Sequence, residues 1–147
     1  MGDYLRKNDF DVFGPNQDGA KLEYSKSWAK EFMKKANIPT SKSWEIDSME
    51  EAEKIIHSSS DPLVVKADGL ASGKGVFIPK SKDECIQATN AILNGKFGES
   101  GQVVVLEEKI QGPEVSIFAL CDGEKYVLLP TAQDLSLIHI SEPTRQH

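Results

Sequence analysis

The sequence predicts a mixed α/β fold of the α+β kind, in which a glycine-rich loop connects two strands of a small sheet packed with helices. Apolar residues recur at helical spacing in some segments, and short β-branched runs bounded by turn residues alternate with these segments. The chain has 147 residues, of which 39% are hydrophobic and 27% are charged. This length and composition are typical of one globular domain whose core needs no metal or disulfide.

The N-terminal part of the chain is expected to be mainly helical. The end of a helix is predicted over residues 4–7 and a short strand over residues 11–13. A longer helix is predicted over residues 20–36, because apolar side chains recur there at helical spacing. It ends before Ile38-Pro39, since the residue that precedes a proline avoids the helical conformation.

A strand and another helix complete the first region, residues 1–60. The strand is predicted over residues 43–46. Ser48 and Glu51 then form a capping box, which predicts a helix that continues to about His57.

The second region, residues 61–134, is expected to contain most of the sheet. Strands predicted over 63–66 and 76–78 flank the glycine-rich loop. A second capping box, Ser81 with Glu84, begins a helix with an apolar inner face. Three further strands are predicted over 103–106, 115–120 and 126–129. The order of these elements indicates an antiparallel sheet around the glycine-rich loop.

Charge and cysteine content argue against several classes of function. The net charge of −6 is unfavourable for a general nucleic-acid or acidic-membrane surface, although a few placed lysines can still hold an anionic ligand. The sequence contains no run of 18 apolar residues, which a membrane-spanning helix would need. Cys85 and Cys121 lie far apart in apolar patterns and are expected to be buried, reduced thiols in a cytoplasmic protein.

The C-terminal segment, residues 135–147, does not continue the pattern of the preceding chain. Residues 135–145 match the translation of a sequencing-library transposase adapter, so we expect this tail to be non-native and exclude it from the fold. His139 and His147 are therefore not considered as ligands. The alternative is a genuine C-terminal tail.

The glycine-rich loop is the strongest candidate for a binding site. In the run Lys66-Ala-Asp-Gly-Leu-Ala-Ser-Gly-Lys-Gly75, closely approaching backbone amides and lysines at both ends suit a polyphosphate. The candidate ligands are Lys66, Gly69, Ser72, Gly73, Lys74 and Gly75. The run is not a Walker A loop, because only three residues separate Gly69 from Gly73 and no helix follows. The alternative is a plain hairpin turn.

A second candidate site follows the strand predicted over 103–106. If a purine lies against the end of this strand, backbone groups of Glu107 and Ile110 can contact its edge. Glu114, beyond the turn at Gly112-Pro113, can accept hydrogen bonds from ribose hydroxyls. Glu108, between Glu107 and Ile110, is also a candidate nucleotide-binding residue. The alternative is a hairpin with a solvated acidic turn.

In this order, the two segments resemble the ATP-grasp superfamily, and within it the phosphoribosylamine–glycine ligase family (glycinamide ribonucleotide synthetases). The loop motif is the most specific feature of the resemblance, which covers nearly all of residues 2–134. Further matching segments are 13–15, 22–26, 32–33, 38–40, 97–98, 107–108, 112–116 and 132–134.

The resemblance implies a role for each matching residue. Lys26 and Lys66 should contact ATP phosphates, and residues 69–75 should form a flap over them. The backbone at Glu107 and Ile110 should bind adenine, and Glu114 should bind ribose.

The resemblance also implies a reaction, in which ATP and glycine form a glycyl phosphate that 5-phosphoribosylamine then attacks, in purine synthesis. The small-molecule partners are thus ATP, glycine and 5-phosphoribosylamine, with Mg²⁺ or Mn²⁺ in the complete enzyme. The metal ligands are expected beyond Asp134, no catalytic residue is assigned, and this part of the enzyme is expected to be inactive alone. Two alternatives remain: another ATP-grasp carboxylate–amine ligase, and a stand-alone nucleotide-binding module.

Overall fold

The computed structural model describes residues 1–69, 71, 74–98 and 103–133, which belong to two compact units. The first unit is Met1–Ile110 and the second is Gln111–His147. Each unit is described by itself. Within the described residues, no helix is both long enough and apolar enough to cross a membrane.

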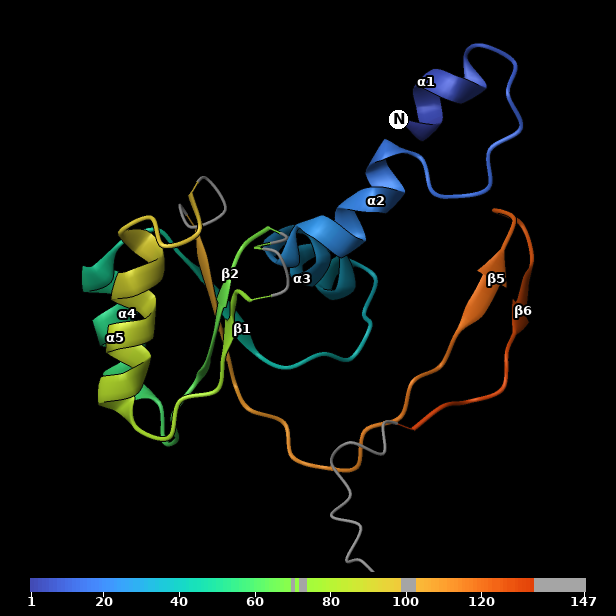
Figure 1. The fold of residues 1–147 in the computed structure, drawn as a ribbon. Coiled ribbons are helices and arrows are strands. Elements are labelled where there is room, and N and C mark those ends of the chain that lie inside the picture. The colour runs from blue at the N-terminus through green and yellow to red at the C-terminus, as the bar shows by residue number, and fades with distance from the viewer. Residues whose placement is uncertain (70, 72–73, 99–102, 134–147) are drawn as a thin grey trace, which may run out of the picture. The chain divides into compact units, whose positions relative to one another are not determined.

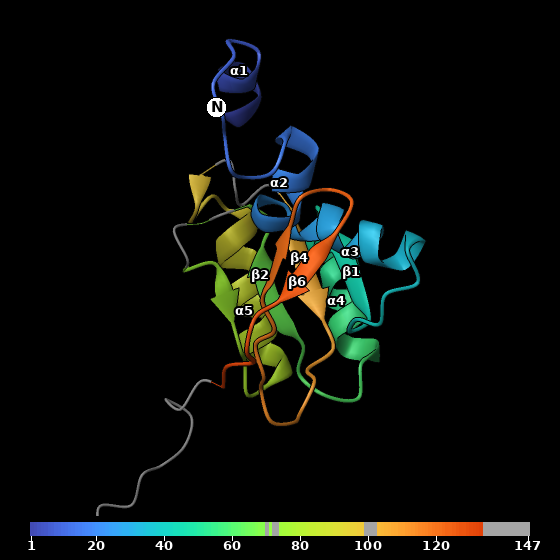
Figure 2. The same cartoon turned by 90° about the vertical axis from the view of Figure 1, so that its right-hand side faces the viewer.

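The centre of the first unit is a four-stranded antiparallel sheet. Its strands lie in the order β1-β4-β2-β3, as the labels of β2, β4 and β1 in Figure 2 show in part. The strands are β1 (Ser43–Ile46), β2 (Val64–Ala67), β3 (Val76–Phe77) and β4 (Val104–Glu107). In this register Lys66 is opposite Val105, and Glu107 is opposite Val64 on one side and Ser43 on the other. The antiparallel sheet around the glycine-rich loop is therefore confirmed.

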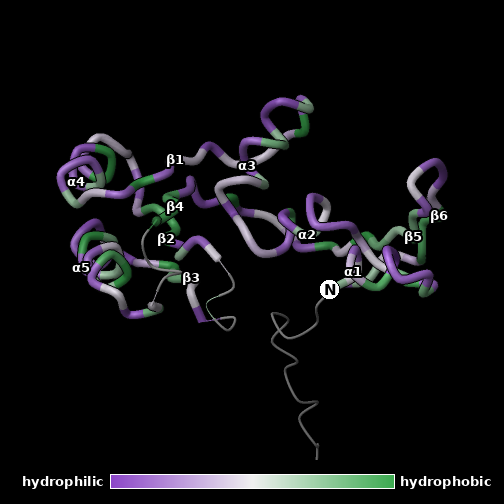
Figure 3. The backbone as a smooth tube through the Cα atoms, turned by 90° about the horizontal axis from the view of Figure 1, so that it is seen from above, coloured by the Kyte–Doolittle hydropathy of each residue, from purple (hydrophilic) through white to green (hydrophobic). Residues whose placement is uncertain are grey.

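Two helices cover one face of this sheet. Figures 1 and 2 show α4 and α5 side by side on that face, and Figure 3 shows hydrophobic residues on both helices and on the strands beside them. Ser81 begins α5 by accepting a hydrogen bond from the Glu84 amide at 3.2 Å. The helices of the first unit are α1 (Gly2–Arg6), α2 (Gln17–Tyr24), α3 (Lys26–Lys35), α4 (Met49–Ser58) and α5 (Lys82–Leu93).

The two faces of the sheet have different side chains. Because side chains alternate along a strand, Val65 and Ala67 of β2 and Leu106 of β4 pack into the core with α4 and α5. Lys66 and Glu107 point to the opposite face. The alternation thus places charged groups on the face that α4 and α5 leave uncovered.

Three details of the predicted N-terminal part are wrong. The helix predicted over 20–36 is two helices, since Ser25 has an extended backbone (φ −119°, ψ 111°). The Ser25 side chain caps α3 by accepting a hydrogen bond from the Trp28 amide. Apolar residues recur at helical spacing from α2 through α3, so the sequence pattern does not reveal the break between the two helices. Residues 11–13 form no strand. The Ser48 side chain makes no capping hydrogen bond, although α4 begins directly after it.

The second unit contains a hairpin of β5 (Ala119–Cys121) and β6 (Tyr126–Leu128), extended by a bridge between Ser116 and Ala132. The strand predicted over 115–120 is thus shorter and shifted towards the turn. Cys121 is exposed, contrary to the expectation of two buried thiols, because no other described segment of the second unit covers this hairpin. Cys85 is buried and its Sγ donates to the Leu63 carbonyl at 3.3 Å.

Substitution of Gly75 tests the close packing where the glycine-rich loop meets the sheet. A Cβ added to Gly75 would lie 2.6 Å from Ala71 Cβ and 3.1 Å from Ala67 Cβ. We expect Gly75→Ala to lower the free energy of unfolding by about 1–3 kcal/mol, measured by urea denaturation. Ala71→Gly removes the nearer atom, so the double variant should recover part of this loss. Equal losses in the single and double variants would contradict this explanation.

Candidate phosphate-binding site

Three charged side chains meet on the face of the sheet opposite α4 and α5. The Lys66 Nζ atom on β2 lies 2.9 Å from Glu107 Oε1 at the end of β4. The Lys30 Nζ atom on α3 lies 3.1 Å from Glu107 Oε2. One carboxylate therefore links two strands and a helix, with one oxygen atom for each ammonium group.

The Glu107 carboxylate is buried but remains ionised. Its residue is only 6% exposed, and Ser41 donates a hydrogen bond to Oε2 at 2.8 Å. Burial by itself raises the pKa of Glu107, but hydrogen bonds from Lys66, Ser41 and Lys30 together with the Lys66 charge bring that pKa below its ordinary value of 4.5. The alternative of a solvated acidic turn is therefore wrong for this residue.

Lys30 belongs to this group of charged side chains but was not predicted from the sequence. Its Nζ atom also donates to Thr40 Oγ1 and Ser41 Oγ, both at 2.7 Å, and to the Ser41 carbonyl at 3.2 Å. Its side chain is 14% exposed. The available signal was its position one helical turn after Lys26, which places both lysines on the same side of α3.

Asp68 joins the start of the glycine-rich loop to the N-terminus of α3. Its Oδ1 atom accepts hydrogen bonds from the Lys26 amide at 2.6 Å and the Ser27 amide at 3.1 Å. Its Oδ2 atom accepts from the Ser27 and Ser25 hydroxyls at 2.9 and 3.2 Å. A carboxylate at this end of a helix is favourable, because the first amides lack partners and the helix dipole is positive there.

The Lys26 side chain reaches the same loop. Its Nζ atom donates to the Gly69 carbonyl at 2.6 Å, immediately after Asp68. The backbone and the side chain of Lys26 are thus both tied to the first two residues of the loop. Lys26, Lys30 and Lys66 give this part of the unit three ammonium groups, against the carboxylates of Asp68 and Glu107. The excess of positive charge suits an anionic ligand.

The structure brings some predicted site residues together and not others. Lys26, Lys66, Gly69 and Glu107 lie in the connected network described above. The base of the loop is closed by the Gly75 carbonyl, which accepts from the Ala67 amide at 2.7 Å. The Lys74 amide donates to the Ala71 carbonyl at 3.0 Å, and its side chain is exposed. Ser72 and Gly73 lie outside the described residues, as does the tail over 135–147.

The residues predicted to bind a nucleoside follow β4. The Glu107 backbone lies inside the sheet, between Ser43 and Val64. The Glu108 amide donates to the Lys42 carbonyl at 3.0 Å, and Ile110 is 74% exposed beyond the strand. Their contacts with adenine remain predictions. Glu114 belongs to the second unit, so its predicted role in ribose binding likewise remains a prediction.

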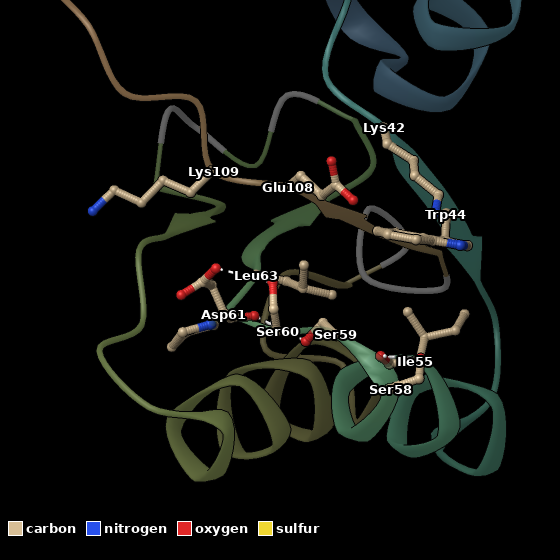
Figure 4. Close-up of a pocket in the computed structure, with 11 residues that line it drawn as sticks. Lys42, Trp44, Ile55, Ser58, Ser59, Ser60, Asp61, Leu63, Glu108 and Lys109 are labelled. Atoms are coloured by element: carbon tan, nitrogen blue, oxygen red, sulfur yellow. Dashed lines mark hydrogen bonds between the residues drawn. The ribbon is translucent and has the colours of Figure 1, made fainter.

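A separate pocket of about 490 Å³ opens where β1 and β2 begin and β4 ends. Figure 4 shows Trp44 and Glu108 on one side of it and the segment from Ser58 to Asp61 on the other. The Ser58 and Ser59 hydroxyls donate to backbone carbonyls of α4. We refer to Lys26, Lys30 and Lys66 as the lysine cluster. Neither these lysines nor Glu107 line this pocket, so the pocket is distinct from the lysine cluster.

The described residues offer no metal site. In that part of the chain, no three His, Cys, Asp or Glu side chains come together as metal ligands require. We therefore assign none of the described residues to a metal ion.

Comparison with known proteins identifies the family. The family model described as "Phosphoribosylglycinamide synthetase, ATP-grasp (A) domain" matches residues 24–142. The match contains the lysine cluster, Asp68 and the glycine-rich loop, and it includes the first eight residues of the segment over 135–147. The chain belongs to this family.

Two relatives of this family share more than 40% of their aligned residues with the chain. The phosphoribosylamine–glycine ligase of Streptococcus pyogenes serotype M1 is 45% identical over 124 residues, which are 84% of this chain and 30% of that protein. The solved structure of phosphoribosylamine–glycine ligase from Thermotoga maritima is 41% identical, with a TM-score of 0.76, over 82% of this chain and 31% of that one. The chain thus spans about 30% of the length of the curated relative.

More distant structures share the fold. D-alanyl-alanine synthetase A from Vibrio cholerae has a TM-score of 0.71 at 16% identity, over 88% of this chain and 39% of that one. The expected α+β architecture with a small antiparallel sheet is confirmed by both structures.

Neutralisation of Glu107 tests the charge cluster through its pH dependence. Because the folded pKa lies below the ordinary value, ionised Glu107 stabilises the fold above that value, and this contribution is lost as the pH falls through the folded pKa. We expect Glu107→Gln to lower the free energy of unfolding by about 1–3 kcal/mol at pH 7 and to flatten its decrease below about pH 5. Urea denaturation across this pH range, with exposed Glu53→Gln as control, measures both effects. Parallel pH profiles for Glu107→Gln and the unsubstituted chain would contradict the assignment.

Substitution of Asp68 tests the connection between the loop and α3. Asp68→Ala removes the acceptor for two amides and two hydroxyls, so the free energy of unfolding should fall by about 1–2 kcal/mol. Asp68→Asn keeps one acceptor oxygen and should lose less. Thermal denaturation followed by circular dichroism measures both, with exposed Asp47→Ala as the matched control. The cap assignment fails if Asp68→Ala and Asp47→Ala behave alike.

Proposed function

We propose that this chain is the ATP-binding portion of a ligase that joins glycine to 5-phosphoribosylamine in purine synthesis. The observation that supports this most directly is the lysine cluster of Lys26, Lys30 and Lys66 beside a glycine-rich loop, in a chain of the phosphoribosylglycinamide synthetase family. The relatives of higher identity carry the name of this ligase. An ATP-grasp dipeptide ligase is less well supported, because the similarity to solved structures of such enzymes is at 16–23% identity.

The reaction requires two steps. A glycine carboxylate oxygen attacks the γ-phosphorus of ATP, which releases ADP and gives glycyl phosphate. The amine of 5-phosphoribosylamine then attacks the acyl carbon, the C–O bond to phosphate breaks, and the amine loses a proton as the amide forms. Negative charge is concentrated on the transferred phosphoryl group and on the leaving ADP, so fixed cations close to these oxygens lower the barrier.

The residues of this chain contribute binding and orientation of ATP. Lys26 and Lys66 are proposed to contact phosphate oxygens, and the loop over 69–75 with Lys74 is proposed to exclude water from the phosphates. Gly69, Ser72, Gly73 and Gly75 belong to this loop. Backbone groups that follow β4 are proposed to hold the adenine, and Glu114 the ribose.

The remaining components of the reaction are proposed to come from outside the described residues. Mg²⁺ or Mn²⁺, when bound, would supply charge neutralisation for the phosphates. We propose that the complete enzyme acts in the cytoplasm on small molecules and does not use nucleic acid. Since the chain spans about 30% of the curated relative, we propose that it does not catalyse the complete reaction alone.

Nucleotide binding by lysine variants tests the proposal. Loss of one phosphate-contacting ammonium should weaken ATP binding roughly tenfold or more, which corresponds to about 1.4 kcal/mol. We expect this for Lys66→Ala and Lys26→Ala, measured by titration calorimetry at constant ionic strength. Exposed Lys35→Ala, which removes only a surface ion pair with Glu31, should bind as the unsubstituted chain does.

The ligase activity is tested separately, in a protein with the length of the relatives, of which this chain covers about 30%. Product formation from glycine, ATP and 5-phosphoribosylamine supports the proposal. Product formed with a second amino acid instead of 5-phosphoribosylamine supports a dipeptide ligase and contradicts it.

A further inference from the structure

The two lysine partners of Glu107 are not equivalent. Lys66 contacts Oε1, whereas Lys30 and Ser41 contact Oε2. Because each oxygen atom has its own donors, Lys66 can leave without disturbing the hydrogen bonds at Oε2. The carboxylate would still be paired with an ammonium group.

The lysines also differ in how firmly they are held. Lys30 donates to Thr40 and Ser41 besides Glu107, and its side chain is 14% exposed. Lys66 is 26% exposed, and within the described residues its Nζ atom has no acceptor other than Glu107. Of the two, Lys66 is therefore the lysine that can turn towards a ligand.

A buried carboxylate without a counter-charge is strongly unfavourable. If Lys30 were absent, movement of Lys66 to a phosphate would leave Glu107 unpaired at 6% exposure. The attraction of Glu107 would then compete with the phosphate for the same ammonium group. With Lys30 present, this competition is reduced.

We propose that Lys30 is a positioning residue for nucleotide binding: it holds the Glu107 charge and so allows Lys66 to leave that carboxylate for a phosphate. This inference rests on the proposed function of Lys66 as a phosphate ligand. Lys30 itself does not contact the nucleotide. Its effect is transmitted through Glu107 alone.

The first test needs no nucleotide. Lys66→Met reproduces the state in which the Lys66 ammonium has left Glu107. We expect Lys66→Met and Lys30→Met each to lower the urea midpoint slightly, and the double variant to lower it by clearly more than the two shifts together. In a Glu107→Gln background this excess should disappear. Additive shifts, or an excess that survives Glu107→Gln, would overturn the inference.

The second test uses ATP as the probe. Lys30→Met should weaken binding roughly tenfold, and Lys30→Arg should bind more tightly than Lys30→Met because it restores the counter-charge. Lys30→Met with Glu107→Gln should recover most of the affinity, since no carboxylate then retains Lys66. A purely structural role of Lys30 predicts further loss in this double variant, and that result would overturn the inference. Lys35→Met is the surface control.

The two tests separate this inference from the proposed function. If the unsubstituted chain binds no ATP but the urea midpoints show the predicted excess, the ATP-binding assignment fails while the role of Lys30 towards Glu107 stands. If ATP binds and depends on Lys66 but is unchanged in Lys30→Met, the inference fails and the proposed function stands.

Discussion

The shared Glu107 carboxylate is the interaction on which the arrangement of the site depends. It connects β4, where it is located, to β2 through Lys66 and to α3 through Lys30. A charge at 6% exposure is tolerated only because both oxygens have ammonium or hydroxyl donors. The same pairing fixes the direction of Lys66, whose side chain otherwise extends from the face of the sheet opposite α4 and α5.

Asp68 provides the second connection between α3 and the sheet. It follows β2 directly and holds the first amides of α3, so the glycine-rich loop and the lysine-bearing helix begin at the same point. Lys26 also contacts this loop at Gly69. The two carboxylates, Asp68 and Glu107, thus place three lysines around one end of β2, where a polyphosphate can be held.

Much of this arrangement could be predicted from the sequence, because strand alternation and loop composition are local properties. The strands around the loop and the antiparallel sheet followed from residues 43–107, and the family followed from the loop motif together with matching segments over residues 2–134. The break at Ser25 could not be predicted, since the hydrophobic pattern is continuous across it and the extended conformation is stabilised by distant Asp68. The Lys30–Glu107 pair was missed for the same reason, because these residues are 77 positions apart and only the tertiary structure brings them together.

A crystal structure of the chain with a non-hydrolysable ATP analogue tests the central claim most directly. We expect Lys66 Nζ to lie within hydrogen-bond distance of a phosphate oxygen and no longer to contact Glu107. Lys30 should remain on Glu107 Oε2, as it is without nucleotide. A complex in which Lys66 still contacts Glu107 and no phosphate, or in which Lys30 leaves that carboxylate, would contradict the proposed exchange of Lys66 from Glu107 to a phosphate.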